Sequence, residues 1–150
     1  MNRRRFLNTL FGVSTLAGFP TVQAWAGEHR KLKHVVYELN EKDPSHELAV
    51  LRNVKNNLNA SGPTAMHIEI VIHGGGINLL KNAVLDDALQ EKINGLKKDG
   101  VKFRVCNNTI HANKLNYKND LYDVSSEDIV PSGVAYLVDR QLEGWAYMHP

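Results

Sequence analysis

Cysteine is the scarcest reactive residue of this sequence, because Cys106 is the only one among 150 residues. A single cysteine excludes an internal disulfide, so the thiol must be buried, pair with a second chain, or react. The sequence also lacks a Gly-x-Ser-x-Gly nucleophile elbow and a Gly-Lys-Ser/Thr phosphate loop. These absences argue against a serine esterase of the α/β-hydrolase type and against a P-loop nucleotide-binding protein.

Residues 27–150 have almost no excess of positive or negative charge. The chain has 18 Lys and Arg against 16 Asp and Glu, and three of the arginines fall within residues 1–26, which contain no acidic residue. Residues 27–150 therefore carry 15 basic against 16 acidic residues, a net charge near −1 apart from histidine. This balance gives no support for a nucleic-acid partner.

Residues 1–26 have the pattern of an export signal. Arginines at positions 3–5 precede two apolar residues, as in the twin-arginine signal, and Ala24-Trp25-Ala26 fits an A-x-A cleavage rule. Polar residues interrupt the apolar part before about 20 continuous residues, so no stable membrane span is expected. We therefore expect a periplasmic, prokaryotic mature domain at residues 27–150. A general secretory signal and an uncleaved amphipathic anchor are the alternatives.

Apolar runs and helical spacings alternate along the rest of the sequence. The runs that predict strands are His34–Asn40, Met66–His73, Val101–Cys106, Ser126–Val130 and Trp145–Met148. The spacings that predict helices cover Pro44–Ala60, Leu79–Gly100 with a break near Val84–Asp86, Thr109–Leu115, and a last helix from Gly133 to Leu142. This alternation predicts a three-layer α/β/α single domain with a mainly parallel sheet of about five strands.

Apolar residues at helical spacing predict which faces of two helices are buried. The first helix is expected to bury Leu48, Leu51, Val54 and Leu58. The last is expected to turn Val134, Leu137, Val138 and Leu142 inward.

Polar and glycine-rich turns follow the predicted parallel strands. Because the carboxyl ends of parallel strands share one sheet edge, we expect Asn40, the turn of Gly74, Gly75 and Gly76, Cys106 and Ser132 to lie along that edge. Strand order is not readable from the sequence, so the pattern leaves open how closely these turns approach one another.

Cys106 stands where a strand gives way to a helix. Unpaired backbone N–H groups and the helix dipole stabilise a thiolate at such a position. Asn107, Asn108 and Thr109 can add side-chain hydrogen bonds to an anionic sulfur or its ligand. The pattern favours a nucleophile or sulfur carrier, and the alternative is a cysteine packed as a small hydrophobe.

His73 and the three glycines after it are interpreted as a tight turn where backbone can approach a ligand or a neighbouring subunit. A metal-binding protein is a further alternative, because His46, His73, His111 and Cys106 supply suitable ligand atoms. Their spacings match no compact metal motif. We therefore predict neither a metal site nor a cofactor.

Four blocks of the sequence together resemble the DsrE/DsrF-like family of small sulfur-metabolism proteins: His73–Gly76, Gly100–Thr109, Val130–Val134 and Gln141–Pro150. The resemblance implies a three-layer α/β domain that assembles as a trimer or hexamer. It also implies that Cys106 occupies the position at which better understood members carry sulfur as a persulfide, taking it from a donor and passing it to an acceptor. The export signal is a departure from the cytoplasmic relay proteins of the family.

These observations give two functional hypotheses. The first is a periplasmic homo-oligomer that binds or transfers sulfane sulfur through Cys106, with donor and acceptor proteins or small sulfur compounds as partners. Its ligand-binding candidates are Asn40, His73, Gly74, Gly75, Gly76, Asn107, Asn108, Thr109 and Ser132. The second is a non-catalytic oligomeric module that binds a small ligand or a partner, with Cys106 packed and inert.

Overall fold

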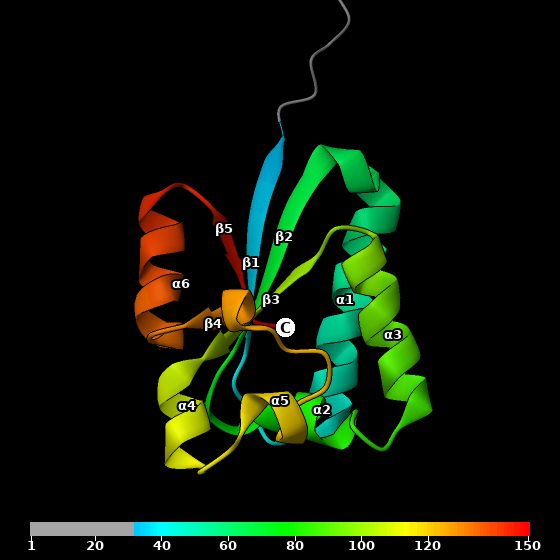
Figure 1. Ribbon diagram of the computed structural model, residues 1–150. Coiled ribbons are helices and arrows are strands. Elements are labelled where there is room, and N and C mark those ends of the chain that lie inside the picture. Colours follow the sequence, from blue (N-terminus) through cyan, green and yellow to red (C-terminus); the bar gives the residue numbers. More distant parts are fainter. Residues whose placement is uncertain (1–31) are drawn as a thin grey trace, which may run out of the picture.

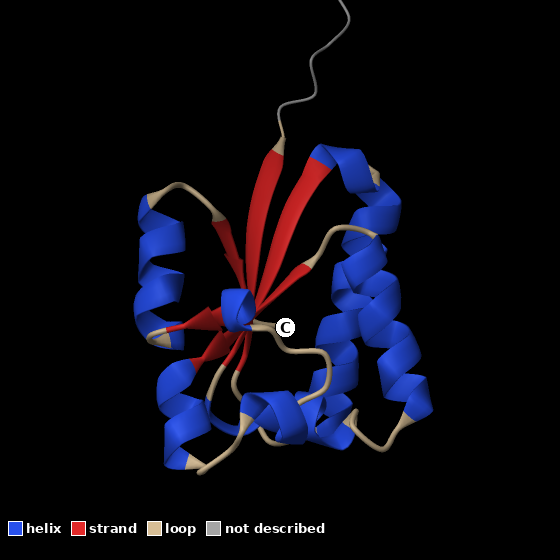
Figure 2. Ribbon diagram, in the orientation of Figure 1, coloured by secondary structure: helices blue, strands red, loops and turns tan. Residues whose placement is uncertain are grey.

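The computed structural model describes residues 32–150, so the predicted export signal at residues 1–26 lies outside the described residues. Within residues 32–150, five strands form one sheet in the order β4-β3-β2-β1-β5, and every neighbouring pair is parallel (Figures 1 and 2). The strands are β1 (Lys33–Leu39), β2 (Met66–Ile72), β3 (Lys102–Cys106), β4 (Ile129–Val130) and β5 (Ala146–Met148). The predicted fold class is confirmed.

Helices cover both faces of the sheet. Figure 1 shows α1 and α3 together on one face and α6 on the other, while α2, α4 and α5 lie toward the ends at which the strands finish. The helices are α1 (Pro44–Ser61), α2 (Ile77–Asn82), α3 (Asp87–Lys98), α4 (Asn107–Ala112), α5 (Tyr117–Asp120) and α6 (Gly133–Leu142). Short 3₁₀ turns are η1 (Pro63–Ala65), η2 (Gly74–Gly76) and η3 (Ser126–Asp128). This is the predicted three-layer arrangement.

Local sequence signals explain where the main helices begin. Asp43 caps α1 by accepting the backbone N–H of Ser45 at 3.1 Å, and Pro44 occupies the first helical position. Asp86 caps α3 in the same way, accepting N–H groups of Ala88 and Leu89 at 2.9 and 3.0 Å. The predicted break between α2 and α3 is therefore confirmed.

Two other elements differ from their predicted bounds. Only Ile129 and Val130 of the predicted fourth strand pair with β3, because Ser126–Asp128 closes into η3 through a capping box between Ser125 and Asp128. Helix α4 begins at Asn107, two residues earlier than expected, and Cys106 is its N-cap. The thiol thus lies at the junction itself.

The prediction for α6 is wrong for three of its four apolar residues. Leu137 is buried, but Val134, Val138 and Leu142 are 59%, 49% and 82% exposed. Tyr136 and Arg140 take the sheet-facing positions instead, because they reach a buried carboxylate on β2, as described below.

A smaller correction applies to α1. Leu48 is 40% exposed, and Val50 joins Leu51, Val54 and Leu58 on the buried face.

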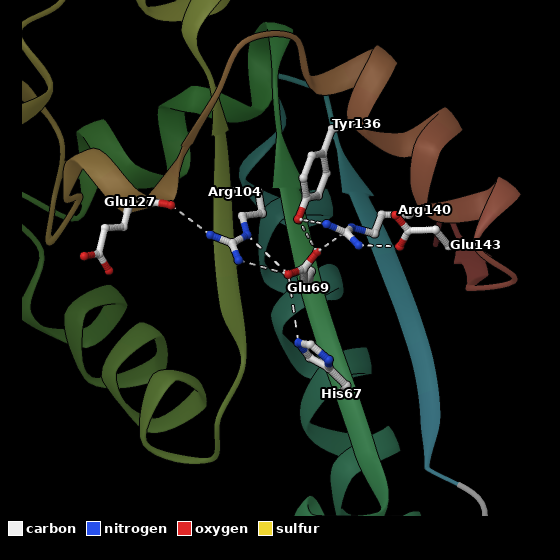
Figure 3. Close-up of polar contacts among 7 residues, drawn as sticks. All are labelled: His67, Glu69, Arg104, Glu127, Tyr136, Arg140 and Glu143. Atoms are coloured by element: carbon white, nitrogen blue, oxygen red, sulfur yellow. Dashed lines mark hydrogen bonds and ion pairs between the residues drawn. The ribbon is translucent and has the colours of Figure 1, made fainter.

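The buried carboxylate is Glu69 of β2, which is only 2% exposed (Figure 3). Its Oε1 accepts hydrogen bonds from Nε and Nη2 of Arg104 at 3.2 and 3.1 Å. Its Oε2 accepts the Tyr136 hydroxyl at 2.7 Å and lies 3.3 Å from Nε of Arg140. Figure 3 shows the two guanidinium groups approaching from β3 and from α6. A buried charge needs such partners, so this cluster fastens α6 to the sheet.

None of the helices within residues 32–150 has the length and apolar content that crossing a lipid bilayer requires.

Neutralising Glu69 should destabilise the fold much more than neutralising Glu143, a surface carboxylate that also contacts Arg140. We expect Glu69→Gln to lower the free energy of unfolding by about 3 kcal/mol, because Arg104 and Arg140 lose their buried counter-charge. Glu143→Gln removes only the exposed ion pair with Arg140 and should cost less than about 1 kcal/mol. Urea denaturation measures both, and equal losses would contradict the assigned role of Glu69.

Candidate functional site

The turns that follow β1, β2 and β3 meet at one edge of the sheet. The N–H of Gly75 donates to the carbonyl oxygen of Asn40 at 2.8 Å, joining the turns after β1 and β2. The N–H of Gly74 donates to Oγ1 of Thr109 at 3.0 Å, joining the turns after β2 and β3. The expected convergence of these turns is therefore present, because β2 lies between β1 and β3.

Cys106 is 5% exposed, yet its sulfur is surrounded by hydrogen-bond donors. Burial raises the pKa of the Cys106 thiol, but hydrogen bonds from the Thr109 hydroxyl and from the N–H groups of Gly133, Thr109 and Asn108 outweigh it. The pKa of the thiol therefore lies below its ordinary value. Asn108 and Thr109 lie in the first turn of α4 and Gly133 is the first residue of α6, so the amino-terminal ends of two helices converge on one sulfur.

Gly133 makes this convergence possible because it has no side chain. A Cβ at this position would lie 3.3 Å from Cβ of Cys106 and 3.0 Å from Cβ of His73. A side chain at this position would therefore be crowded against Cys106 and His73 unless its neighbours shifted. Gly133 is thus part of the site, although the sequence suggested only that it opens a helix.

A pocket of about 400 Å³ lies at this edge of the sheet, and Cys106 itself is not among the residues that line it. Its lining includes Gly74, Asn108 and Thr109, together with Lys42 and Lys81. Thr109 connects the pocket to the sulfur, because its hydroxyl accepts the Gly74 N–H and donates to Cys106. The two lysines make the pocket suited to an anion.

A second polar chain runs from His73 to the last strand. Nε2 of His73 lies 2.7 Å from Oε1 of Glu38, and the Tyr147 hydroxyl donates to Oε2 of Glu38. Burial raises the pKa of the Glu38 carboxyl, but hydrogen bonds from Tyr147 and His73 outweigh it and hold that pKa below its ordinary value. Burial and the bond to Glu38 raise the pKa of Tyr147 to about 12.

The remaining predicted site residues have structural partners. The amide nitrogen of Asn40 donates to Glu38 at 3.1 Å, and the hydroxyl of Ser132 caps α6 by accepting the N–H of Ala135 at 3.4 Å. Gly76 is buried, and a Cβ there would lie 2.2 Å from the carbonyl oxygen of Leu39. The backbone that approaches this glycine is therefore the chain's own β1.

The three predicted ligand-binding residues that follow Cys106 differ in their relation to the sulfur. Asn108 and Thr109 contribute to the lowered pKa of the Cys106 thiol, while Asn107 is the half-buried first residue of α4.

Sequence reasoning missed Glu38 and Tyr147. The available signal was a carboxylate inside the otherwise apolar run His34–Asn40, since an ionisable group in a buried strand requires a partner. That partner comes from β5, more than a hundred residues further along the chain.

A larger pocket of about 580 Å³ lies between α1 and α3 and is lined by residues such as Leu48, Arg52 and Lys92. None of its lining residues belongs to the turns described above.

The hydroxyl of Thr109 should control the acidity of the thiol. We expect Thr109→Val to raise the thiol pKa, because the sulfur loses a donor while its burial is unchanged. Thr109→Ser keeps the hydroxyl and should titrate like the parent. Thiolate absorbance near 240 nm against pH, taken as the difference from a Cys106→Ser protein so that tyrosine ionisation cancels, reports the one cysteine of the chain. Identical titrations of the valine and serine variants would contradict this assignment.

Comparisons with known proteins agree with this architecture. No curated protein sequence matches the chain at a significant level. Four chains of solved structures match. One of them is a protein of unknown function, MTH1491 from Methanobacterium thermoautotrophicum, with 34% sequence identity and a TM-score of 0.68 over 79% of this chain and 99% of that chain. The sequence profile of the DsrE/DsrF-like family matches residues 35–150, which cover β1 almost from its start and every later element. The chain therefore belongs to the DsrE/DsrF-like family.

Proposed function

We propose that this protein is a periplasmic sulfur carrier that holds sulfane sulfur as a persulfide on Cys106. Membership of the DsrE/DsrF-like family suggests a role in sulfur relay. The observation that carries the proposal is the set of hydrogen-bond donors around the sulfur, which lowers the thiol pKa in spite of burial. The sequence pattern of an export signal at residues 1–26 supports the periplasmic location.

The loading step is a displacement at sulfur. The Cys106 thiolate attacks the outer sulfur of a donor such as thiosulfate or a polysulfide and forms a new S–S bond. The S–S bond of the donor breaks, and its remaining part leaves with the bonding electron pair, as sulfite when the donor is thiosulfate. The product is an anionic persulfide. No outside oxidant or reductant takes part, because the donor's own S–S bond supplies the balance.

The pocket lined by Thr109, Lys42 and Lys81 supports this chemistry. Lys42 and Lys81 can attract an anionic donor, and the N–H groups at the start of α4 and α6 can stabilise the persulfide anion that forms. The second hypothesis, a packed and inert Cys106, is supported by its 5% exposure. An inert hydrophobe has no need of hydrogen-bond donors at its sulfur, which favours the carrier.

Intact-mass analysis tests the carrier directly. After incubation with polysulfide or thiosulfate, the parent protein should gain about one sulfur atom, and reductant should remove it. Cys106→Ser should gain nothing while keeping the same circular dichroism and melting temperature. A serine variant that gains the same mass, or a parent whose thiol stays unloaded and unreactive when native, would end the proposal.

The exposed apolar face of α6 supports assembly with further copies of the chain. Val134, Val138 and Leu142 project from one side of this helix, away from Glu69, and a contiguous apolar face is typical of a protein interface. We propose that the protein is a homo-oligomer that buries this face.

Placing a charge on this face should therefore separate the subunits. We expect Val138→Glu to reduce the molar mass measured by light scattering to that of fewer chains, because a carboxylate would be buried without a partner. Leu85→Glu is the matched control, since Leu85 is 94% exposed and lies in the turn between α2 and α3. A parent that is already monomeric, or a Val138→Glu protein of unchanged mass, would contradict the assigned interface.

A further inference from the structure

Three potential metal ligands meet at the end of β1, apart from the residues that surround the thiol. Glu41 lies between β1 and α1, His46 is in the first turn of α1, and His149 follows β5. One ligand atom from each lies within 4.8 Å of the other two. The parallel pairing of β5 with β1 creates this cluster, because it ends at Tyr37 and Met148 and delivers His149 beside the turn that follows β1.

The hydrogen bonds of Asn40 define which nitrogen of His149 is free. The Asn40 amide nitrogen donates to Glu38, a carboxylate that only accepts, so the amide oxygen faces His149. Nε2 of His149 lies 3.3 Å from that oxygen and must donate to it. The neutral ring therefore keeps its lone pair on Nδ1. A second-sphere carbonyl that fixes the tautomer in this way is typical of histidines that bind metals.

His46 adds an unpartnered nitrogen. Its Nε2 is buried and has no hydrogen-bond partner among residues 32–150, which is costly for a polar atom unless something else satisfies it. The His46 and His149 rings lie 5.5 Å apart between centroids. Nearby carboxylates favour a cation, since Glu38 contacts Asn40 next to His149 and Asp43 precedes His46 by three residues.

We propose that Glu41, His46 and His149 bind a divalent transition-metal ion, for which Zn²⁺ is the representative probe. Two imidazole nitrogens and one carboxylate oxygen match the preferences of such ions and not those of Mg²⁺ or Ca²⁺. Zinc ligands lie about 2.0–2.2 Å from the ion, which places ligand atoms roughly 3.3 Å apart in a tetrahedral site. Glu41 is exposed and can close the remaining gap by side-chain rotation.

Three protein ligands leave a fourth position for water or a second ligand. The ion would also tie the last residues of the chain to the start of α1. This site is built from β1, α1 and β5, so it does not depend on sulfur chemistry at Cys106, whose donors come from α4 and α6.

Calorimetric titration of the full chain with Zn²⁺ tests the site in a Cys106→Ser background, which removes the thiolate as a competing zinc ligand. We expect one equivalent to bind, with an affinity at least about tenfold weaker after His149→Ala or Glu41→Gln. His111→Ala is the matched control, because His111 is an exposed histidine of α4 outside the cluster, and it should bind like the parent. Excess Mg²⁺ should not compete.

Two results would overturn the metal site. One is that the Cys106→Ser protein binds no Zn²⁺, and the other is that His149→Ala and Glu41→Gln bind it as tightly as His111→Ala does. Melting temperatures with and without Zn²⁺ give a second readout, because a bound ion stabilises the folded state and should raise the melting temperature of the parent and of His111→Ala only. Every protein in this series carries Cys106→Ser and cannot form a persulfide at that position. The outcome of the metal titration is therefore independent of the carrier hypothesis.

Discussion

Parallel pairing of the strands is the constraint on which the rest of the structure depends. Each parallel strand must be followed by a crossover, so the chain leaves the sheet at the same edge every time and helices begin there. At this edge α4 begins directly after β3 and α6 shortly after β4, and both start at the sulfur of Cys106. The Thr109 hydroxyl and the unpaired N–H groups of these helix amino termini together explain why a buried thiol has a lowered pKa here.

The two faces of the sheet are stabilised by different interactions. The α1 and α3 side is an extensive apolar core, whereas the α6 side holds a small apolar cluster and the ion-paired Glu69. Because Tyr136 and Arg140 use the inner side of α6 to reach Glu69, Val134, Val138 and Leu142 remain outside. The same polar cluster that fastens α6 thus leaves three apolar residues of this helix exposed.

The position of α6 also connects stability to function. Its first residue, Gly133, donates to the sulfur and contacts both Cys106 and His73, while its second and third turns are held by Glu69. Glu69 therefore helps to hold the start of α6, and with it Gly133, in place beside the sulfur. The last strand has a comparable role at the other side of the edge, where it brings Tyr147 to Glu38 and His149 to His46.

The sequence alone determined how strands and helices alternate along the chain, the parallel class of the sheet, and the place of Cys106 at a strand end. These depend on local periodicity, caps and breakers, such as Asp43-Pro44 and Asp86, which act within a few residues. Only the tertiary structure decided the order of the strands within the sheet and which side of α6 is exposed. It also decided that Gly133 lies against the thiol and that Glu41 lies near His149. Each of these joins segments distant in the sequence, and pairing between distant segments follows from how strands and helices pack rather than from any local pattern.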